Sequence, residues 1–412
     1  MEYGLIAQRL GHSFSKEIHA RLASYEYELK ELEFSQLDTF MKARDFKAIN
    51  VTIPYKGEVI KYLDEIDPVA AEIGSVNTVV NKNGRLIGFN TDFAGMKAMI
   101  IKSGIILNGK KVLILGSGGT SRTALSVCKN MGAAEIYQVS RTKSNTFITY
   151  DQAYSLHNDA QIIINTTPCG MYPEICTTPI NLSGFKNLQG AIDVVYNPLK
   201  TEFALSAEKQ GAKTVCGLYM LVAQAVFACE KFLDKKFDNS TIDRVYKELL
   251  KGKQNIVLIG MPASGKTTLG KYISENTGRK FYDTDEIIEQ KTGKHPSVII
   301  NEQGEAAFRD IESVVVKEIS AVSGAVIATG GGAVLREENR TNLHKNGVIW
   351  FIDRPIEQLI TTPDRPLSSS RAALEERYNE RYPIYNATAD YVLKDFDTVS
   401  QAAEQIEKDM LK

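Results

Sequence analysis

The chain contains 412 residues, of which 43% are hydrophobic and 24% are charged, and its formal net charge is −1. This length and composition predict two or three globular domains with cores of ordinary size. A net charge so close to zero argues against nucleic acid as a partner.

The cysteines and the N-terminal segment indicate in which cellular compartment the protein is expected. The five cysteines are odd in number and form no C-x-x-C pair, which argues against a disulfide framework or a zinc site. The opening MEYGLIAQRLGHSFSK lacks the apolar core of a secretory signal, and no uninterrupted apolar run is long enough to span a membrane. We therefore expect free thiols, no membrane contact and a cytoplasmic location.

Apolar runs typical of strands alternate with amphipathic stretches typical of helices. In chain order these runs are AINVTI (48–53), KVLILG (111–116), AEIYQVS (134–140), AQIIINTT (160–167), GAIDVVY (190–196), NIVLIG (255–260), AVIATGGG (325–332) and GVIWFID (347–353). The alternation predicts α/β domains built on parallel sheets. The segment 234–254 is polar, and we place a domain boundary near Gly252, which gives domains of 1–252 and 253–412.

A glycine-rich turn follows the second of these runs. Gly116, Gly118 and Gly119 form a variant of the dinucleotide-binding fingerprint, in which a tight turn lets a pyrophosphate approach a helix N-terminus. A glycine turn between a strand and a helix is also an ordinary connection. An NAD site places an acidic residue about 20 positions further on, whereas this chain has a hydroxyl and positive charges that favour NADP(H), namely Ser140, Arg141, Thr142 and Lys143.

The sequence GMPASGKT at 260–267 is a complete P-loop pattern between a strand and a helix start. Its backbone N–H groups wrap nucleotide phosphates, Lys266 reaches the outer phosphates and the Thr267 hydroxyl binds Mg²⁺. The expected ATP contacts are Gly260, Ala263, Ser264, Gly265, Lys266, Thr267 and Thr268. Two different phosphate-binding loops predict two nucleotides and two reactions.

The first part of the chain resembles shikimate dehydrogenase over nearly all of residues 1–251. The resemblance is carried by the ordered series GHSFS (11–15), NVTIPYK (50–56), GSVNT (74–78), GFNTD (88–92), INTTPCGM (164–171), DVVYNPLKT (193–201) and GLYMLVAQA (217–225). It implies reduction of 3-dehydroshikimate to shikimate with NADPH. It also implies a substrate lobe of about 1–92 with a returning helix at about 218–245, and a Rossmann-type NADP-binding lobe of about 93–217.

Reducing a ring ketone needs a proton donor beside the carbonyl oxygen and a group that sets the charge of that donor. Lys56 and Asp92 are the candidates, although a lysine and an aspartate also form surface ion pairs. Ser13 and Ser15 alternate in a segment expected to be extended, which would direct both hydroxyls to the substrate carboxylate; two serines also commonly form a turn or a helix cap. The resemblance implies further substrate contacts by Thr52, Asn77, Tyr196 and Gln224.

The C-terminal part, from Asn255 on, resembles shikimate kinase, which transfers the ATP γ-phosphate to the 3-hydroxyl of shikimate. Two acidic residues lie two apart in FYDTDEIIE, on a segment expected to be a strand, and so would face the same way. The resemblance assigns Asp283 to the magnesium region and Asp285 to the acceptor hydroxyl. It further implies a shikimate carboxylate site with Arg309, held by Glu312, and Arg381, close substrate approach at Gly330, Gly331 and Gly332, and a lid with the phosphate-contacting Arg365.

Together these features predict a fused enzyme that makes shikimate and then phosphorylates it, with only small molecules as substrates. Two alternatives remain at this point. The first alternative is a shikimate-sensing regulator that has lost its chemistry. The argument against it is that the chain retains the residues expected to carry the chemistry, namely Lys56, Asp92, Lys266, Asp285 and Arg365. Otherwise, the dehydrogenase part uses quinate or NAD(H) instead. The oligomeric state is left open.

Overall fold

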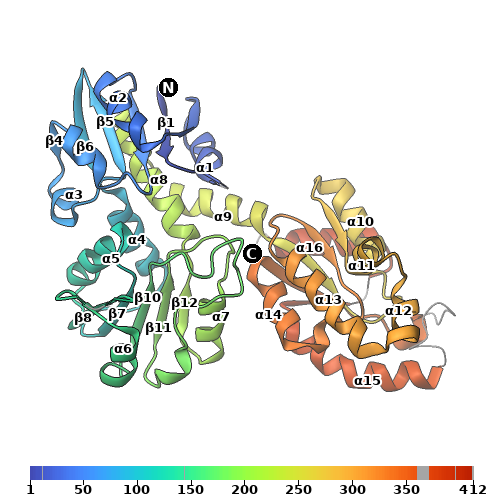
Figure 1. The fold of residues 1–412 in the computed structure, drawn as a ribbon. Helices are drawn as coiled ribbons and strands as arrows, with labels where there is room; N and C mark the ends of the chain where they lie inside the picture. The colour runs from blue at the N-terminus through green and yellow to red at the C-terminus, as the bar shows by residue number, and fades with distance from the viewer. Residues whose placement is uncertain (12, 143, 360–370, 395, 411–412) are drawn as a thin grey trace. The chain divides into compact units, whose positions relative to one another are not determined.

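The computed structural model describes residues 1–11, 13–142, 144–359, 371–394 and 396–410. Within these residues the strands form three sheets. The chain divides into two compact units, Met1–Asn197 with Thr201–Leu249, and Pro198–Lys200 with Leu250–Lys412. The first unit carries two of the sheets and the second unit carries the third (Figure 1).

The first sheet has the strand order β2-β1-β3-β5-β6-β4. Its elements are β1 Tyr3–Ala7, α1 Ser15–Leu22, β2 Tyr27–Glu31, α2 Phe34–Ala43, β3 Ala48–Val51, β4 Glu65–Ile66, α3 Pro68–Ile73, β5 Thr78–Lys82 and β6 Arg85–Phe89. Residues from β1, β3, β5 and β6 form a core with α2 on one face. Alternate residues of the same strands pack against α8 on the other face.

This sheet is not wholly parallel, in contrast to the expectation from the sequence. Strands β1, β2 and β3 are parallel, but β5 pairs antiparallel with both β3 and β6. The antiparallel pairing of β5 with β6 follows from the two-residue turn Asn83–Gly84, whose residues have φ angles of 54° and 86°. An Asn-Gly pair accepts this left-handed backbone and closes a tight hairpin, so the chain reverses directly instead of crossing over through a helix.

The second sheet is parallel throughout, with the strand order β12-β11-β10-β7-β8-β9. Its elements are α4 Thr91–Ser103, β7 Lys111–Leu115, α5 Gly119–Asn130, β8 Glu135–Val139, β9 Phe147–Ile148, α6 Tyr150–Leu156, β10 Ile162–Asn165, β11 Gly190–Asp193, α7 Glu202–Lys209, β12 Lys213–Val215 and α8 Leu218–Leu233. One face packs on α4, α5 and α8, and the other face packs on α6 and α7. The strand order reverses beside β7, which is the switch point where dinucleotide-binding sheets hold their ligand.

Helices α4 and α8 pack against each other and connect the two sheets of the first unit (Figure 1). Their close approach depends on Gly95, because a Cβ atom there would lie 2.9 Å from both the Met220 carbonyl oxygen and the Gln224 Cβ. Helix α8 therefore carries Gln224 to the N-terminal part of α4.

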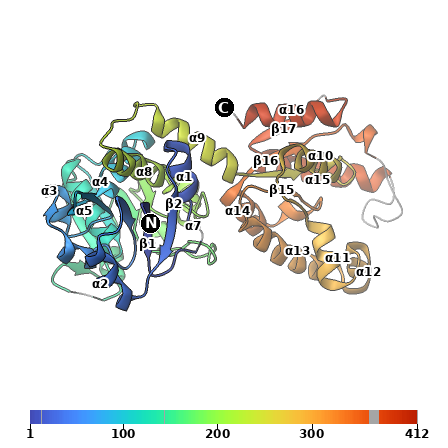
Figure 2. The ribbon, with the colours of Figure 1, turned by 90° about the horizontal axis from the view of Figure 1, so that it is seen from above.

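The third sheet is parallel, with the strand order β14-β15-β13-β16-β17. Its elements are β13 Asn255–Ile259, α10 Lys266–Thr277, β14 Phe281–Asp283, α11 Thr284–Thr292, α12 Pro296–Gln303, α13 Glu305–Ser320, β15 Val326–Ala328, α14 Glu337–Asn346, β16 Gly347–Ile352, α15 Arg371–Thr388, β17 Tyr391–Leu393 and α16 Val399–Asp409. Alternate residues of β13, β15 and β16 pack on α10 and α16 on one face and on α11 to α15 on the other. Figure 2 shows α16 and α13 on opposite sides of these strands.

The polar segment 234–254 includes one long helix, α9 Thr241–Lys253, which runs across the boundary expected at Gly252. The division into compact units falls between Leu249 and Leu250, inside this helix. No helix among the described residues has the length and apolar character needed to cross a bilayer.

Candidate active sites

The first candidate site forms where the segment after β3 meets the N-terminus of α4. Lys56 Nζ donates a 2.6 Å hydrogen bond to Asp92 Oδ2, and the two side chains are only 16% and 10% exposed. Asn90 begins the helix by accepting a hydrogen bond from the Phe93 N–H. The pair is thus a sheltered ion pair and not a surface one, and its lysine is held in direct contact with a carboxylate.

Asn77 and Gln224, expected as substrate contacts, lie together beside this pair. The Asn77 Nδ2 donates to Gln224 Oε1 at 3.5 Å and to Thr91 Oγ1 at 3.0 Å. The Thr91 N–H donates to Asn77 Oδ1 at 2.7 Å. Asn77 therefore links α8 to the first turn of α4, the turn that also carries Asp92.

A buried layer of polar residues lies under these groups, and the sequence reasoning did not identify it. Tyr27 donates from its hydroxyl to Asn50 Oδ1 at 2.8 Å, and Asn50 Nδ2 donates to Thr78 Oγ1 at 3.1 Å. The signal was an asparagine inside the otherwise apolar start of AINVTI. A buried amide needs partners, and here the partners fix the strand end that precedes Thr52.

Ser13 and Ser15 do not alternate along an extended segment, so that expectation was wrong. Phe14 between them has helical backbone angles, and α1 begins at Ser15. The Ser15 N–H donates to Ser13 Oγ at 3.3 Å, because a helix start leaves N–H groups that a nearby hydroxyl satisfies. The Phe14 ring lies 5.3 Å from the ring of Tyr196, which brings this tyrosine to the same segment.

The glycine turn lies at the carboxyl end of β7. Gly116 has a φ angle of 117°, and a Cβ atom there would lie 2.7 Å from Thr166 Oγ1. Gly118 and Gly119 open α5, and no Cβ contact lies within 4 Å at Gly118. The turn therefore presents a helix N-terminus with space for a pyrophosphate, which fits a bound dinucleotide.

The residues expected to select the coenzyme follow β8, the strand next to β7 in the sheet. Ser140 Oγ accepts a hydrogen bond from the Thr142 N–H at 3.4 Å. Arg141 and Thr142 are exposed, and no acidic residue stands in their place. Lys143 lies outside the described residues.

One carboxyl of this unit is buried completely. Asp193, at the end of β11, accepts hydrogen bonds from the Thr201 hydroxyl, the Val195 N–H and Asn165 Nδ2 at 2.6, 2.9 and 3.0 Å. Burial raises its pKa to about 6 against these three hydrogen bonds. It joins the loops after β10 and β11, one of which carries Tyr196.

The second candidate site is the P-loop between β13 and α10. Gly260, Ala263 and Gly265 have φ angles of 145°, 66° and 94°, which turn backbone N–H groups inward in the manner of an anion-binding loop. Lys266 is 8% exposed and donates from Nζ to the carbonyl oxygens of Gly260 and Met261 at 3.0 and 2.8 Å. The buried Ser264 and the exposed Thr268 complete the expected set.

Thr267 and Asp283, expected in the magnesium region, are in direct contact. The Thr267 hydroxyl donates to Asp283 Oδ2 at 2.7 Å. Asp283 also caps α11, because its Oδ1 accepts from the Asp285 N–H at 3.0 Å. No group of three or more His, Cys, Asp or Glu side chains among the described residues is placed to hold a metal by itself. The pair fits Mg²⁺, which keeps waters and binds through few protein oxygens and nucleotide phosphates.

Asp285 does not share a strand face with Asp283, as the sequence reasoning expected. Strand β14 ends at Asp283, and Asp285 lies in the first turn of α11. Burial, and after it the neighbouring Asp283 carboxylate, raises the pKa of Asp285. A Cβ atom at Gly330 would lie 2.8 Å from both Asp285 Oδ1 and Glu312 Oε1, so these carboxylates flank the glycine run.

Arg309 lies in the same site and is held from two sides. It donates from Nη1 to Glu312 Oε2 at 2.7 Å and from Nη2 to Glu305 Oε1 at 2.9 Å. Glu312 is fully buried, as expected for a residue that fixes Arg309, whereas the sequence reasoning missed Glu305. A Cβ atom at Gly332 would overlap the Arg309 guanidinium, so only glycine leaves that group in place.

Arg381 reaches the glycine run from α15. Its Nη1 donates to the Gly331 carbonyl oxygen at 3.2 Å, and the Tyr385 hydroxyl donates to the same oxygen. A Cβ atom at Gly331 would lie 2.7 Å from the Pro262 Cδ of the P-loop. The glycine run thus lies between the P-loop and the arginines. Arg365, the expected lid arginine, lies outside the described residues.

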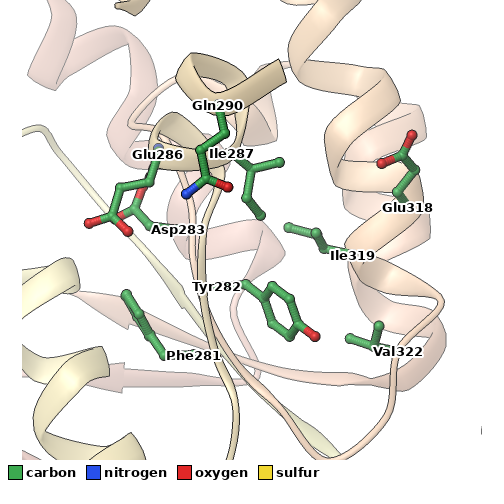
Figure 3. Close-up of a pocket in the computed structure, with 9 residues that line it drawn as sticks. All are labelled: Phe281, Tyr282, Asp283, Glu286, Ile287, Gln290, Glu318, Ile319 and Val322. Carbon is green, nitrogen blue, oxygen red and sulfur yellow. Dashed lines mark hydrogen bonds between the residues drawn. The ribbon is translucent and has the colours of Figure 1, made fainter. Parts of the chain in front are cut away.

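A separate pocket of about 450 Å³ runs along the outer edge of β14. Figure 3 shows Glu286, Ile287 and Gln290 on one side of it and Glu318, Ile319 and Val322 on the other. Among the expected site residues it includes Asp283 alone. Its other carboxylates form ion pairs, Glu286 with Lys271 at 2.9 Å and Glu318 with Lys291 at 2.6 Å.

The chain matches two family models. Residues 5–79 match the shikimate dehydrogenase substrate binding domain, and residues 262–411 match shikimate kinase. Among curated proteins, it is 37% identical over 266 residues to shikimate dehydrogenase (NADP(+)) of Clostridium perfringens strain SM101, covering 60% of this chain and 97% of the relative. The corresponding protein of Clostridium beijerinckii is 36% identical over 262 residues, covering 59% and 96%.

Solved structures give the same result. A chorismate mutase/shikimate 5-dehydrogenase fusion protein from Clostridium acetobutylicum is 37% identical, with a TM-score of 0.57, covering 60% of this chain and 96% of the other. A shikimate 5-dehydrogenase from Thermus thermophilus, solved in complex with NADP(H) and shikimate, is 28% identical, with a TM-score of 0.54, covering 60% and 99%.

Proposed function

The chain belongs to the shikimate dehydrogenase family over 60% of its length and continues into a shikimate kinase domain, and from this premise we propose how its own residues perform two consecutive reactions. It is a bifunctional enzyme of the shikimate pathway, with NADP-dependent oxidoreductase and ATP-dependent kinase activities. The first activity reduces 3-dehydroshikimate to shikimate, and the second converts shikimate to shikimate 3-phosphate.

In the reduction, NADPH supplies the hydride. The proposed proton donor is Lys56, and Asp92 holds it in place through their 2.6 Å hydrogen bond. Asn77, Gln224 and Thr52 are proposed to bind ring hydroxyls. The hydroxyls of Ser13 and Ser15 are proposed to bind the substrate carboxylate, and Tyr196 is proposed to make a further contact with the substrate. The single observation that supports this assignment best is the shelter of the Lys56–Asp92 pair beside Asn77 and Gln224.

Two loops of the first unit are proposed to bind NADP(H). Gly116, Gly118 and Gly119 are proposed to contact the pyrophosphate. Ser140, Arg141, Thr142 and Lys143 are proposed to bind the 2′-phosphate, because positive charge and hydroxyls stabilise it where a carboxylate would repel it.

In the phosphorylation, ATP bound with Mg²⁺ supplies the phosphoryl group. Lys266 and the backbone of the P-loop are proposed to hold its phosphates, and Thr267 with Asp283 to hold the metal. Asp285 is proposed to orient the attacking 3-hydroxyl and accept its proton, a role supported by its place beside the glycine run, where a Cβ atom at Gly330 would lie 2.8 Å from its Oδ1. Arg309 and Arg381 are proposed to bind the carboxylate, and Arg365 to contact the transferred phosphate.

The proposed division of the chain places the dehydrogenase in residues 1–252 and the kinase in residues 253–412, each with its own site. The proposed location is the cytoplasm, where both coenzymes are available.

Assays of the purified full chain test the function directly. NADPH oxidation with 3-dehydroshikimate and ADP formation with shikimate are both expected. The reverse reaction, run with NADP⁺ or NAD⁺ and with shikimate or quinate, separates the alternatives, and NADP⁺ with shikimate is expected to give the highest kcat/KM. A preference for quinate or for NAD⁺ would contradict the assignment, and binding of shikimate without either activity would indicate a sensor.

A further inference from the structure

An arginine that the proposed mechanism does not use lies one helical turn from Arg381. Arg377 and Arg381 are four residues apart on α15 and therefore lie on the same face of the helix. Arg381 is buried and donates to the Gly331 carbonyl oxygen. Arg377 thus extends the face of α15 that reaches the proposed carboxylate site.

The Arg377 guanidinium is shielded from water on one side without a matching acceptor. Its Nη1 atom is buried and has no hydrogen-bond partner among the described residues. A buried charged donor without an acceptor is strongly unfavourable, and such groups in native proteins usually have a reason to be retained. Arg309 has Glu312 and Glu305 on its Nη atoms, and its Nε, like Arg377 Nη1, has no partner among the described residues.

Two charged groups of the proposed site act on Arg377. Burial, and after it the Arg381 charge, lowers the pKa of Arg377, while Glu305, Glu380 and Glu376 act in the opposite direction. Glu305 is also the residue that holds Arg309 Nη2. Arg377 is therefore electrostatically coupled both to Arg381 and to the glutamate beside Arg309.

The packing of the helices agrees with this placement. Both α13, which carries Arg309, and α15 pack against the short helical turn Ala333–Leu335. This turn directly follows Gly332, the position where a Cβ atom would overlap Arg309. Two helices that meet at the glycine run thus bring three guanidinium groups toward one region.

We propose that Arg377 is a third guanidinium of the kinase carboxylate site and donates from Nη1 to the carboxylate of the ring acid. This inference rests on the proposed kinase function. An anion bound among Arg309, Arg377 and Arg381 satisfies the buried donor and removes the repulsion between like charges on adjacent turns. Arg377 then contributes to selection of acids over uncharged ring alcohols.

The test compares the wild-type full chain with Arg377→Gln in a steady-state kinase assay at saturating MgATP. A charge-assisted hydrogen bond predicts that KM for shikimate rises about 10-fold or more, while kcat and KM for ATP stay within about twofold. Arg377→Lys, which retains the charge, is expected to restore part of the affinity. With the uncharged carboxamide of shikimate as substrate, the wild type and Arg377→Gln are expected to have similar KM values.

Lys291→Gln is the matched control, because it removes an exposed positive charge from the same unit. It is expected to leave all constants unchanged, and the fluorescence of Trp350, which lies in the same unit, checks that each variant is folded there. The inference is overturned if Arg377→Gln leaves KM for shikimate unchanged, if it impairs the carboxamide equally, or if it raises KM for ATP instead. If the wild type itself does not phosphorylate shikimate, the proposed function fails and the inference fails with it.

Discussion

The hydroxyl of Thr267 donates a 2.7 Å hydrogen bond to the Asp283 carboxylate. The first turn of α10 and the end of β14 therefore place a hydroxyl oxygen and a carboxylate oxygen side by side. Removing the hydroxyl by Thr267→Val is expected to raise the Mg²⁺ concentration for half-maximal kinase activity by about 10-fold or more. Thr267→Ser, which keeps the hydroxyl, is the control. The Mg²⁺ concentration for half-maximal activity is measured by following ADP formation at increasing MgCl₂. Identical curves for the valine variant and the wild type would exclude Thr267 from the metal site.

The two reactions are expected to fail separately. Lys56→Ala removes the proposed proton donor and should lower NADPH oxidation by about 10²–10⁴-fold, with ADP formation unchanged. Lys266→Ala should lower ADP formation by about 10²-fold or more, with NADPH oxidation unchanged. Lys47→Ala, at an exposed ion pair with Glu2, is the control for the loss of a lysine. Loss of both activities from either single variant in folded protein would contradict independent sites.

Gly332→Ala tests the position of Arg309. The new Cβ atom would overlap the guanidinium, which Glu312 and Glu305 otherwise hold in place. Displacement of Arg309 is expected to raise KM for shikimate about 10-fold, with KM for ATP changed less. Gly252→Ala is the matched control, because a Cβ atom there meets nothing within 4 Å. An unchanged KM for shikimate in Gly332→Ala would show that this arginine is not needed at its observed place.

Asp193 is expected to make the stability of the dehydrogenase unit depend on pH. Its pKa is raised from 3.8 to about 6 by burial, so the folded state favours the protonated carboxyl. The resulting stabilisation is complete below the unfolded pKa and is lost as the pH rises through about 6. Between pH 4.5 and 7 the loss is about 2 kcal/mol in the free energy of unfolding.

The measurement is urea denaturation of the wild type and Asp193→Asn at both pH values, followed by circular dichroism. Trp350, the single tryptophan of the chain, lies in the other unit and reports its unfolding separately by fluorescence. The wild type should lose about 2 kcal/mol relative to the variant between the two pH values. A difference that does not change with pH would refute the raised pKa.

Short contiguous patterns made the most reliable predictions. The P-loop forms as expected because its chemistry resides in consecutive backbone N–H groups, whose directions local glycines determine. The apolar runs from AINVTI to GVIWFID each contain a strand, because a buried strand needs a continuous apolar segment. The hairpin of β5 and β6 also had a local signal, the Asn83–Gly84 turn, that the sequence reasoning did not use.

Errors arose where one residue had two possible local structures. Ser13 and Asp283 each have side-chain oxygens that accept from the backbone N–H two positions later. Both hydrogen bonds lie at the starts of helices, and the one from Asp283 caps its helix, at positions that alternation alone assigns to extended chain. The spacing of Ser13 and Ser15, or of Asp283 and Asp285, therefore did not determine the direction of their side chains.

The amino-acid sequence by itself indicated the two phosphate-binding loops, because each depends on residue type and short spacing, and its resemblance to two families predicted a lysine with an aspartate for reduction and arginines for an acid. Only the tertiary structure revealed the shelter of Lys56 and Asp92, the contacts of Asn50, Glu305 and Tyr385, and the buried, unpartnered Nη1 of Arg377. Except for the i,i+4 pair of Glu305 and Arg309, these contacts join elements distant in the chain, and burial is a property of the packed fold that no local pattern encodes.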